Sequence, residues 1–322
     1  MKSSVYACYL KNEEQLRRSS SGGAYTAISN VILNQNGSII ACSYNYETHT
    51  MEFVAISDGI SRDNSRGSKY VQADASALYQ LLQNEFKRMD GSPLMVVGTP
   101  CQIAAVKQWM KIKQIKTERK VLLCDILCHG VSSPVMWREY IHGIETCNGK
   151  KISFITFKDK EKGWIRPTTK GNFTDGESIL LEDYALLYRS DDFMRESCYA
   201  CPFATIDRGT DITIGDFWNI ANVNSDFMNS LGTSMVMVHS QLGEDIFGQA
   251  KEQLYLLETS VEDAMQHNMK EPTHKGKRYF DIHMDYRRRG LSYIIEKYVH
   301  YGSGNLWLRR IRRKIMRMKY EK

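Results

Sequence analysis

The chain has 322 residues, 42% of them hydrophobic, which is enough apolar material to bury one large core or two smaller ones. The sequence shows no charged segment followed by an apolar one near its start and no uncharged apolar run of about 20 residues, so we expect neither a signal peptide nor a membrane-spanning helix. These features indicate a cytoplasmic protein, whose eight cysteines we expect to be free, metal-bound or catalytic rather than joined in disulfides.

The net charge of +6 arises at the C-terminal end. Residues 305–322 contain eight Lys or Arg and one Glu, which leaves 35 basic and 36 acidic residues in the rest of the chain. A nearly neutral body argues against a nucleic-acid-binding surface across the fold, and we expect no nucleic-acid partner.

The first predicted element is a helix that begins near residue 24 and stops at Gly37. Its apolar residues recur at helical spacing, at Ala24, Ala27, Ile28, Val31 and Ile32. Two strands are predicted at residues 38–44 and 51–57. Asp74 is then the expected N-cap of a second helix, whose inward residues are Leu78, Leu81, Leu82 and Phe86.

Strands and helices continue to alternate in the middle of the chain. A helix is expected from Ser133, because Pro134 is favoured at the first helical position. The elements before it are a strand at 93–97, a helix at 102–111 and a strand at 120–127. The alternation predicts an α/β core with partly parallel pairing. Short strands follow at 151–157, 164–173 and 177–181, so we expect a mixed sheet flanked by helices.

Four cysteines are candidates for one metal or iron–sulfur site. Cys198 and Cys201 form a C-x-x-C pair, and the sequence holds no second such pair. Cys101 and Cys128 each lie just past the carboxyl end of a predicted strand, which is the edge where open α/β sheets bind ligands. We therefore expect these four thiols to converge. Spacing alone accommodates zinc as well as a [4Fe-4S] cluster, and an isolated C-x-x-C is equally consistent with half a zinc site or a chance pair.

The other cysteines are less suitable as ligands. Cys124 would face the same side of its strand as Cys128, but it lies within the body of the strand. Cys8, Cys42 and Cys147 have no glycine-bearing loops or cysteines next to them, so we expect core residues or surface thiols there.

Six motifs, in order along the chain, resemble the beta-subunit family of coenzyme F-420 hydrogenases and dehydrogenases. They are SSSGGAYTAI, GSKYVQAD, GTPCQIAAV, DILCHGVSSPVMW, KGW and CYACPFATIDRGTDITIGDFW, and the resemblance covers roughly residues 5–238. This family implies a non-covalent FAD and a [4Fe-4S] cluster, with Cys101, Cys128, Cys198 and Cys201 matching the ligands. We therefore expect a flavin and iron–sulfur oxidoreductase domain at residues 1–270 and a helical extension at 271–322.

Two glycine-bearing loops are the candidate flavin-binding segments. Ser19, Ser20, Ser21, Gly22 and Gly23 lead directly into a helix, where backbone N–H groups, hydroxyls and the positive helix end suit a diphosphate. An ordinary N-cap and turn is the alternative, and the chain has neither G-x-G-x-x-G nor a P-loop motif.

The second loop consists of Gly67, Ser68, Lys69 and Tyr70. Its lysine would place positive charge near the pyrimidine end of a flavin, and the family pattern contains this lysine. The alternative is a solvated surface lysine.

The implied function is an oxidoreductase subunit that passes electrons between a hydride donor or acceptor and an iron–sulfur partner. Deazaflavin, nicotinamide or a small organic substrate fit the first role, and bacterial relatives encoded near surface-polysaccharide genes point by analogy to glycan synthesis. Many relatives begin with a ferredoxin-like module that this sequence lacks, so a ferredoxin-like or other iron–sulfur protein is expected as a separate partner. A non-catalytic, zinc-stabilised interaction protein of a glycan-assembly complex is the alternative.

Three further polar residues have smaller expected roles. His129 would tune the potential of a cluster by bonding a sulfur, or would cap the strand end. Asp125 and Asp216 lie in strand-like segments and are expected to fix the surrounding loops. Ser132 stands where many relatives have proline.

Residues 306–320 read as a basic amphipathic helix. Its apolar stripe is Leu308, Ile311, Ile315 and Met318, with Trp307 at the margin. A helical tail of this kind is typical of a peripheral anchor on an anionic membrane, here the inner face, or of a docking helix for an acidic partner. Ordinary packing of the stripe on the domain is the alternative.

Overall fold

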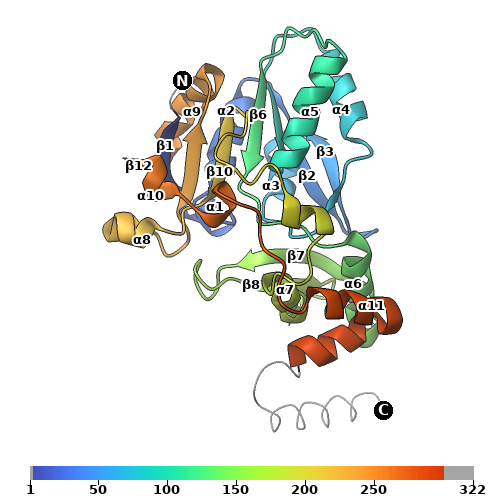
Figure 1. The fold of residues 1–322 in the computed structure, drawn as a ribbon. Helices are drawn as coiled ribbons and strands as arrows, with labels where there is room; N and C mark the ends of the chain where they lie inside the picture. The colour runs from blue at the N-terminus through green and yellow to red at the C-terminus, as the bar shows by residue number, and fades with distance from the viewer. Residues whose placement is uncertain (1–2, 301–322) are drawn as a thin grey trace.

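The computed structural model describes residues 3–300, which form a large sheet, a small sheet and the helices around them (Figure 1). The large sheet has nine strands. Their order is β12 (Leu254–Thr259), β1 (Ser4–Leu10), β11 (Ser234–Val238), β10 (Ile212–Asp216), β6 (Val121–Ile126), β5 (Leu94–Gly98), β2 (Ser38–Asn45), β3 (Thr50–Ile56) and β4 (Ala73–Asp74).

The centre of this sheet is parallel and its flanks are largely antiparallel. Strands β10, β6, β5 and β2 pair in parallel, whereas β1, β11 and β12 pair antiparallel on one side and β3 pairs antiparallel with β2 on the other. All five residues of β5 are buried, as expected for a central strand covered on both faces. The predicted mixed, partly parallel α/β fold is confirmed.

Helices cover both faces of the large sheet. The first core packs α2 (Ala24–Asn34) and α9 (Gln241–Ala250) against one face. The second packs α4 (Leu78–Phe86) and α5 (Pro100–Ile112) against the other face. Period-2 alternation along β6 divides its residues between them, since Cys124 belongs to the first core and Leu123 to the second. The apolar stripe predicted from Ala24 is buried in α2 as expected.

A smaller antiparallel sheet lies below the large one in Figure 1, surrounded by its own helices. It consists of β7 (Ile152–Asp159), β8 (Thr168–Phe173) and β9 (Ser178–Leu180). The helices α6 (Pro134–Asn148), α7 (Glu182–Arg189) and α11 (Tyr279–Ile294) share an aromatic-rich core with it. The strands predicted in residues 151–181 therefore form a separate sheet, and the mixed character of the large sheet arises from other strands.

Two details of the predicted elements need correction. Asp74 is not a helix N-cap, because it ends β4 and its Oδ1 accepts a hydrogen bond from the Ser76 backbone N–H at 2.8 Å, while α4 begins after Ala77. Residues 164–167 are not in a strand, because the indole N–H of the buried Trp164 bonds the Asp216 carboxylate at 2.8 Å and draws this segment toward β10.

The remaining elements are short. They are α1 (Glu13–Arg17), α3 (Gly59–Ser65), α8 (Ile220–Val223), α10 (Val261–Ala264), the 3-10 helices η1 (Glu196–Ala200), η2 (Ser225–Phe227), η3 (Lys251–Gln253) and η4 (His267–Met269), and the π-helix η5 (Ile295–His300). Within residues 3–300, none of the helices combines the length and apolar character that crossing a membrane requires. The predicted basic helix at 306–320 lies outside the described residues.

Candidate functional site

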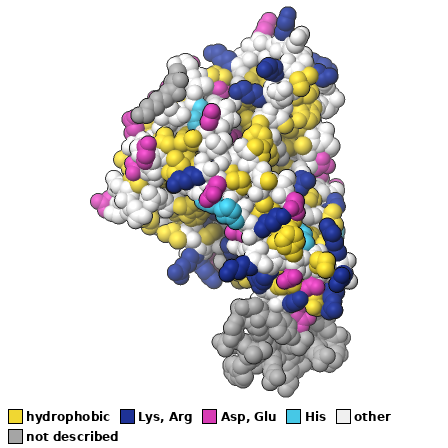
Figure 2. Space-filling view, in the orientation of Figure 1, with side chains coloured by type: hydrophobic (Ala, Val, Ile, Leu, Met, Phe, Trp, Pro, Cys, Tyr) yellow, Lys and Arg dark blue, Asp and Glu magenta, His cyan; other side chains and the backbone are white. Residues whose placement is uncertain are grey.

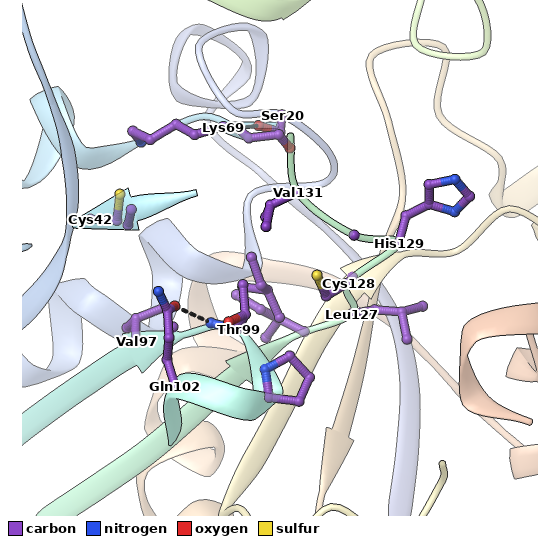
Figure 3. A pocket seen from close by; sticks show the side chains of 18 of the residues that line it. Ser20, Cys42, Lys69, Val97, Thr99, Gln102, Leu127, Cys128, His129 and Val131 are labelled. Atoms are coloured by element: carbon purple, nitrogen blue, oxygen red, sulfur yellow. Dashed lines mark hydrogen bonds between the residues drawn. The ribbon is translucent and has the colours of Figure 1, made fainter. Parts of the chain in front are cut away.

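A cavity of about 400 Å³ lies at the carboxyl ends of the central parallel strands. The ends of β5, β6 and β10 reach it through Gly98, Ile126 and Ile214. Figure 3 shows Cys128 near the centre of this space, Ser20 and Lys69 together along one side, and His129 directed away from it. The cavity therefore occupies the edge at which α/β sheets bind ligands.

The four candidate cysteines line the same cavity. Cys101 is exposed in the first turn of α5, Cys128 follows β6 by two residues, Cys198 lies in η1 and Cys201 directly after it. Burial raises the pKa of the Cys128 thiol to about 12, and the nearby Cys101, Cys198 and Cys201 contribute to the increase. Four thiolates in mutual range need a cation among them to remain charged.

Gly130 allows the loop after β6 to approach η1. Its φ is +142°, and a Cβ atom there would lie 2.2 Å from Met194 Sδ and 3.4 Å from the Cys198 Cβ. The Arg195 N–H donates to the Val131 carbonyl at 2.9 Å, which joins the two cysteine-bearing segments. A glycine at this position is thus a condition for bringing Cys128 and Cys198 together.

Ser132 ties the Cys128 loop to the loop at residues 67–72. Its backbone N–H donates to the Tyr70 carbonyl at 3.1 Å, and its carbonyl accepts from the Gln72 N–H at 3.1 Å. A proline at this position would lack the first of these donors. Ser132 therefore makes a hydrogen bond beside the cavity that a proline could not.

The spacing of the sulfurs bears on which ion fits them. Among residues 3–300, the groups of three or more potential ligands whose ligand atoms all lie within 4.8 Å of one another are His49/His142/Glu145 and His267/Glu271/His274, and no cysteine is among them. Thiolates around a tetrahedral zinc ion are about 3.8 Å apart, given zinc–sulfur bonds of about 2.3 Å. The four cysteines are therefore more widely spread than a closed zinc site, which suits a larger group.

The remaining cysteines lie in different environments. Cys124 is fully buried in the core shared with α2 and α9 and does not line the cavity, and Cys8 is buried in the same core. Cys42 was expected to be a core residue or surface thiol, but it lines the cavity at the other side from Cys128, as Figure 3 shows. Cys147 is exposed on α6.

The two candidate flavin loops meet at the cavity. The Ser68 N–H donates to the Ser20 hydroxyl oxygen at 2.7 Å. Seven of the nine predicted residues line the cavity, namely Ser19, Ser20, Ser21, Gly23, Gly67, Ser68 and Lys69. Gly22 and Tyr70 do not: a Cβ at Gly22 would lie 2.1 Å from the Cys8 carbonyl oxygen, and the Tyr70 ring stacks on Tyr188 at 4.5 Å.

The serine hydroxyls of the first loop are not equivalent. Ser19 Oγ donates to the Gln15 carbonyl at 2.8 Å, and Ser21 Oγ donates to the Thr233 carbonyl at 2.9 Å. Ser20 Oγ accepts a hydrogen bond, so its own proton is available to a ligand. The hydroxyl of Ser20 is therefore the best placed of the three to bind a ligand.

Lys69 is held by main-chain oxygens. Its Nζ donates to the carbonyls of Ser65, Arg66 and Gly67 at 2.8, 3.1 and 3.1 Å. Burial lowers the pKa of Lys69, and the nearby Cys42 opposes this change. The side chain is thus an anchored cation in the cavity wall, unlike a solvated surface lysine.

Arg66 also lines the cavity, and the sequence did not single it out. Its side chain is only 5% exposed. Asp63 contacts its Nη2, and Nε and Nη1 have no hydrogen-bond partner within the described residues. An arginine just before the glycine of a loop resembles an ordinary surface charge in sequence, and only its burial distinguishes it.

The smaller polar candidates fix loops. His129 Nε2 lies 2.7 Å from Asp191 Oδ1, and its carbonyl accepts from the Thr273 hydroxyl at 2.7 Å, which favours the capping interpretation. Asp216 is bonded by Lys158 at 2.5 Å as well as by Trp164. Asp125 is buried 3.5 Å from Arg208 Nη1, and burial raises its pKa to about 6.

Comparisons with known proteins place this chain in a family. Residues 92–264 match the family model for the C-terminal part of the coenzyme F420 hydrogenase/dehydrogenase beta subunit. No curated protein matches the chain. Among solved structures, the chain is similar to one in the F420-reducing [NiFe] hydrogenase complex from Methanosarcina barkeri, with 17% identity, a TM-score of 0.52, and coverage of 79% of this chain and 81% of that chain. At this identity the structural likeness shows a shared fold. Because the family model matches more than half of its residues, the chain belongs to the coenzyme F420 hydrogenase/dehydrogenase beta-subunit family.

Proposed function

We propose that this protein is an oxidoreductase subunit that binds FAD and a [4Fe-4S] cluster and passes electrons between a hydride donor or acceptor and an iron–sulfur partner. Its family identifies it as an electron-transferring oxidoreductase. The observation that carries the finer proposal is that four cysteines and two Ser/Gly loops, distant in sequence, line one cavity.

The residues of this cavity fit both groups. Cys101, Cys128, Cys198 and Cys201 supply the four thiolates that a [4Fe-4S] cluster takes, and their wide spacing favours the cluster over zinc. Bound beside it, a flavin would exchange a hydride with a substrate and single electrons with the cluster. The chain's own contribution is to hold both groups in one cavity, with the Lys69 ammonium in its wall.

The exposed surface next to η1 is the proposed docking site of the partner. Tyr199, between the two cysteines of the C-x-x-C pair, contacts the Tyr279 ring edge-on at 5.1 Å. Lys275 lies 4.5 Å from the Tyr279 ring and 5.2 Å from the ring of Phe280, which is 72% exposed. Figure 2 shows further Lys and Arg side chains over the part of the molecule where α11 lies. Lys275 itself is paired with Glu196, so an acidic ferredoxin-like protein would contact the exposed aromatic rings here and the Lys and Arg side chains around them.

Anaerobic purification tests the proposed function. The protein should show flavin absorbance with a broad iron–sulfur shoulder and contain about four irons per chain, the content of one [4Fe-4S] cluster. A colourless protein with one zinc ion would instead support the zinc-stabilised interaction protein.

The substrate can be identified by testing which electron donors reduce the bound flavin. Reduced deazaflavin, NADH, NADPH and reduced ferredoxin are offered anaerobically as donors, and the flavin band is followed. Rapid bleaching by reduced deazaflavin alone would assign the role that the family's name describes, and a sugar-linked substrate that reoxidises the flavin would support a role in surface-polysaccharide synthesis.

A further inference from the structure

We propose that Arg66 and the N-terminus of α2 form the subsite for the diphosphate of a dinucleotide. This inference rests on the proposed function and deepens it, because it names the part of the cofactor that these residues bind. A dinucleotide diphosphate occurs in FAD and in nicotinamide dinucleotides, and the experiment below separates the two.

The first observation is the state of Arg66. Arg66 lines the cavity, its side chain is 5% exposed, and Asp63 contacts its Nη2, whereas Nε and Nη1 lack partners among residues 3–300. Buried polar groups in proteins almost always have partners. The unpaired Nε and Nη1 therefore indicate an anionic acceptor with several oxygens, which a diphosphate provides.

The second observation is the local charge. The Asp63 carboxylate is shared by three arginines, with Arg62 Nε at 2.7 Å, Arg18 Nη1 at 3.6 Å and Arg66 in direct contact. Arg18 Nη1 also lies 4.0 Å from Glu14 Oε1, so three cations and two carboxylates leave one positive charge in excess. The diphosphate diester of a dinucleotide is an anion, so its binding would offset this excess.

Arg62 does not compete for the role of ligand. Its Nη1 already donates to the Thr26 carbonyl at 3.1 Å, to Ser29 Oγ at 2.9 Å and to Asn30 Oδ1 at 2.7 Å. These bonds fasten α3 to α2. Arg66, on the other hand, has the free donors and faces the cavity.

The third observation is the N-terminus of α2, an eleven-residue helix. Its N-cap is Gly23, no described side chain caps it, and its first turn holds no acidic residue. Ala24, Tyr25 and Thr26, whose backbone N–H groups form that first turn, line the same cavity as Arg66. Uncapped first-turn amides and the positive helix end favour a phosphate oxygen.

Two hydrogen bonds hold Arg66 against this helix end. The Tyr25 hydroxyl lies 2.6 Å from Ser65 Oγ, and the Ser68 N–H donates to Ser20 Oγ at 2.7 Å. The two bonds flank Arg66 in sequence. They bring the guanidinium, the α2 amides and the Ser20 hydroxyl to one side of the cavity.

The test compares ligands with and without a diphosphate on the full chain. Affinities for FAD, riboflavin, ADP and NADH are measured by equilibrium dialysis for the wild type, Arg66→Met and Arg18→Met. Arg18 also contacts Asp63 but is 59% exposed and does not line the cavity, so its variant removes the same charge without removing a cavity donor.

We expect Arg66→Met to weaken FAD and ADP at least about tenfold, as loss of a charge-assisted bidentate contact does, and to change riboflavin less than about threefold. Arg18→Met should change all of them less than about threefold. Unchanged FAD affinity in Arg66→Met, or equal losses for FAD and riboflavin, would overturn the inference. NADH binding that depends on Arg66 while FAD binding does not would assign the subsite to nicotinamide dinucleotides.

A second measurement needs no variant. Inorganic pyrophosphate should displace ADP from the wild type without displacing riboflavin, and failure to compete with ADP would refute the subsite. If the wild type binds ADP through Arg66 but no flavin, the proposed flavin function fails and the diphosphate subsite stands.

Discussion

At the scale of single residues, the four cavity cysteines carry the sharpest expectation. Replacing Cys101, Cys128, Cys198 or Cys201 by Ser removes one of four thiolates, so each variant should lose most of the roughly four irons per chain that one cluster contributes. Iron content and the visible spectrum after anaerobic purification measure this loss.

Cys124→Ser is the matched control for this series. Cys124 is buried in the core shared with α2 and α9, so the variant should lose about 1–2 kcal/mol of stability by burying a hydroxyl but keep its iron. Loss of iron in Cys124→Ser together with retention in Cys128→Ser would exchange the roles of the two residues.

The same scale shows what a sequence can reveal about a site. Cys101 and Cys128 were predicted because strand ends are visible in the hydrophobic pattern and adjacent strand ends meet at one edge. Arg66 and Cys42 were not, because their position in the cavity depends on how α3 and β2 pack after folding. The end of a strand or helix is visible in the local sequence pattern. The burial of one charged side chain, by contrast, depends on tertiary packing.

At the scale of elements, two glycines should respond oppositely to alanine. Gly143 is exposed within α6, and a Cβ atom there would meet only open space, so Gly143→Ala should raise stability by about 0.5–1 kcal/mol through helix propensity. At Gly22 the Cβ would lie 2.1 Å from the Cys8 carbonyl oxygen and 2.5 Å from the Ser234 backbone nitrogen, so Gly22→Ala should cost about 1–3 kcal/mol or more, on the scale of overpacking a core. Urea unfolding measures both, and equal effects would contradict the close packing of the Ser19–Gly23 loop against β1 and β11.

A buried histidine between β2, β3 and α6 should make the fold sensitive to acid. His49 is 1% exposed, with Nδ1 3.0 Å from the Tyr44 hydroxyl and Nε2 3.2 Å from Glu145 Oε1. Burial lowers its pKa, although Glu145 partly opposes this, so the folded state favours neutral His49. Stability from this group is therefore present at neutral pH and lost as the pH falls through the histidine range.

The variant His49→Gln isolates this effect. The urea midpoint is measured at pH 7 and at pH 5, which is above the range in which most carboxylates titrate. Between these two pH values the midpoint should fall more for the wild type than for His49→Gln. An identical decrease in both proteins would show that groups other than His49 carry the pH dependence.

The elements themselves were predicted unevenly, for a physical reason. Strands β2, β5 and β6 and helices α2, α5 and α6 follow from hydrophobic period, Gly stops and Pro starts within each segment. The order in which strands pair is not local, since β1 lies between β11 and β12 and the strands of residues 151–181 form their own sheet. Pairing of this kind is decided by long-range packing that no short pattern records.

At the scale of the whole molecule, the C-terminal basic segment sets the expected behaviour toward membranes. Seven Lys or Arg lie in residues 306–320. At about 1 kcal/mol per basic residue near an anionic surface, these charges would hold the protein on anionic vesicles at low salt. Co-sedimentation of the full chain with anionic but not neutral vesicles is the expected result.

The control is a chain that ends at Ser303, which should remain in the supernatant with both kinds of vesicle. If the full chain also stays there with anionic vesicles, the segment belongs on the protein or on an acidic partner.

The place of β1 in the large sheet has a consequence for biosynthesis. Val5 pairs with Met237 on one side and with Thr259 on the other, so its strand has no neighbours until about 230 further residues have been made. At about 5–20 residues per second, the nascent chain would wait roughly 10 to 50 seconds before the sheet closes. The Ser19–Gly23 loop packs on the same strands, since Gly22 touches both Cys8 and Ser234. About three quarters of the 322 residues are thus made before the Ser19–Gly23 loop has its full packing surface, so binding of any ligand by this loop is a late event in biosynthesis.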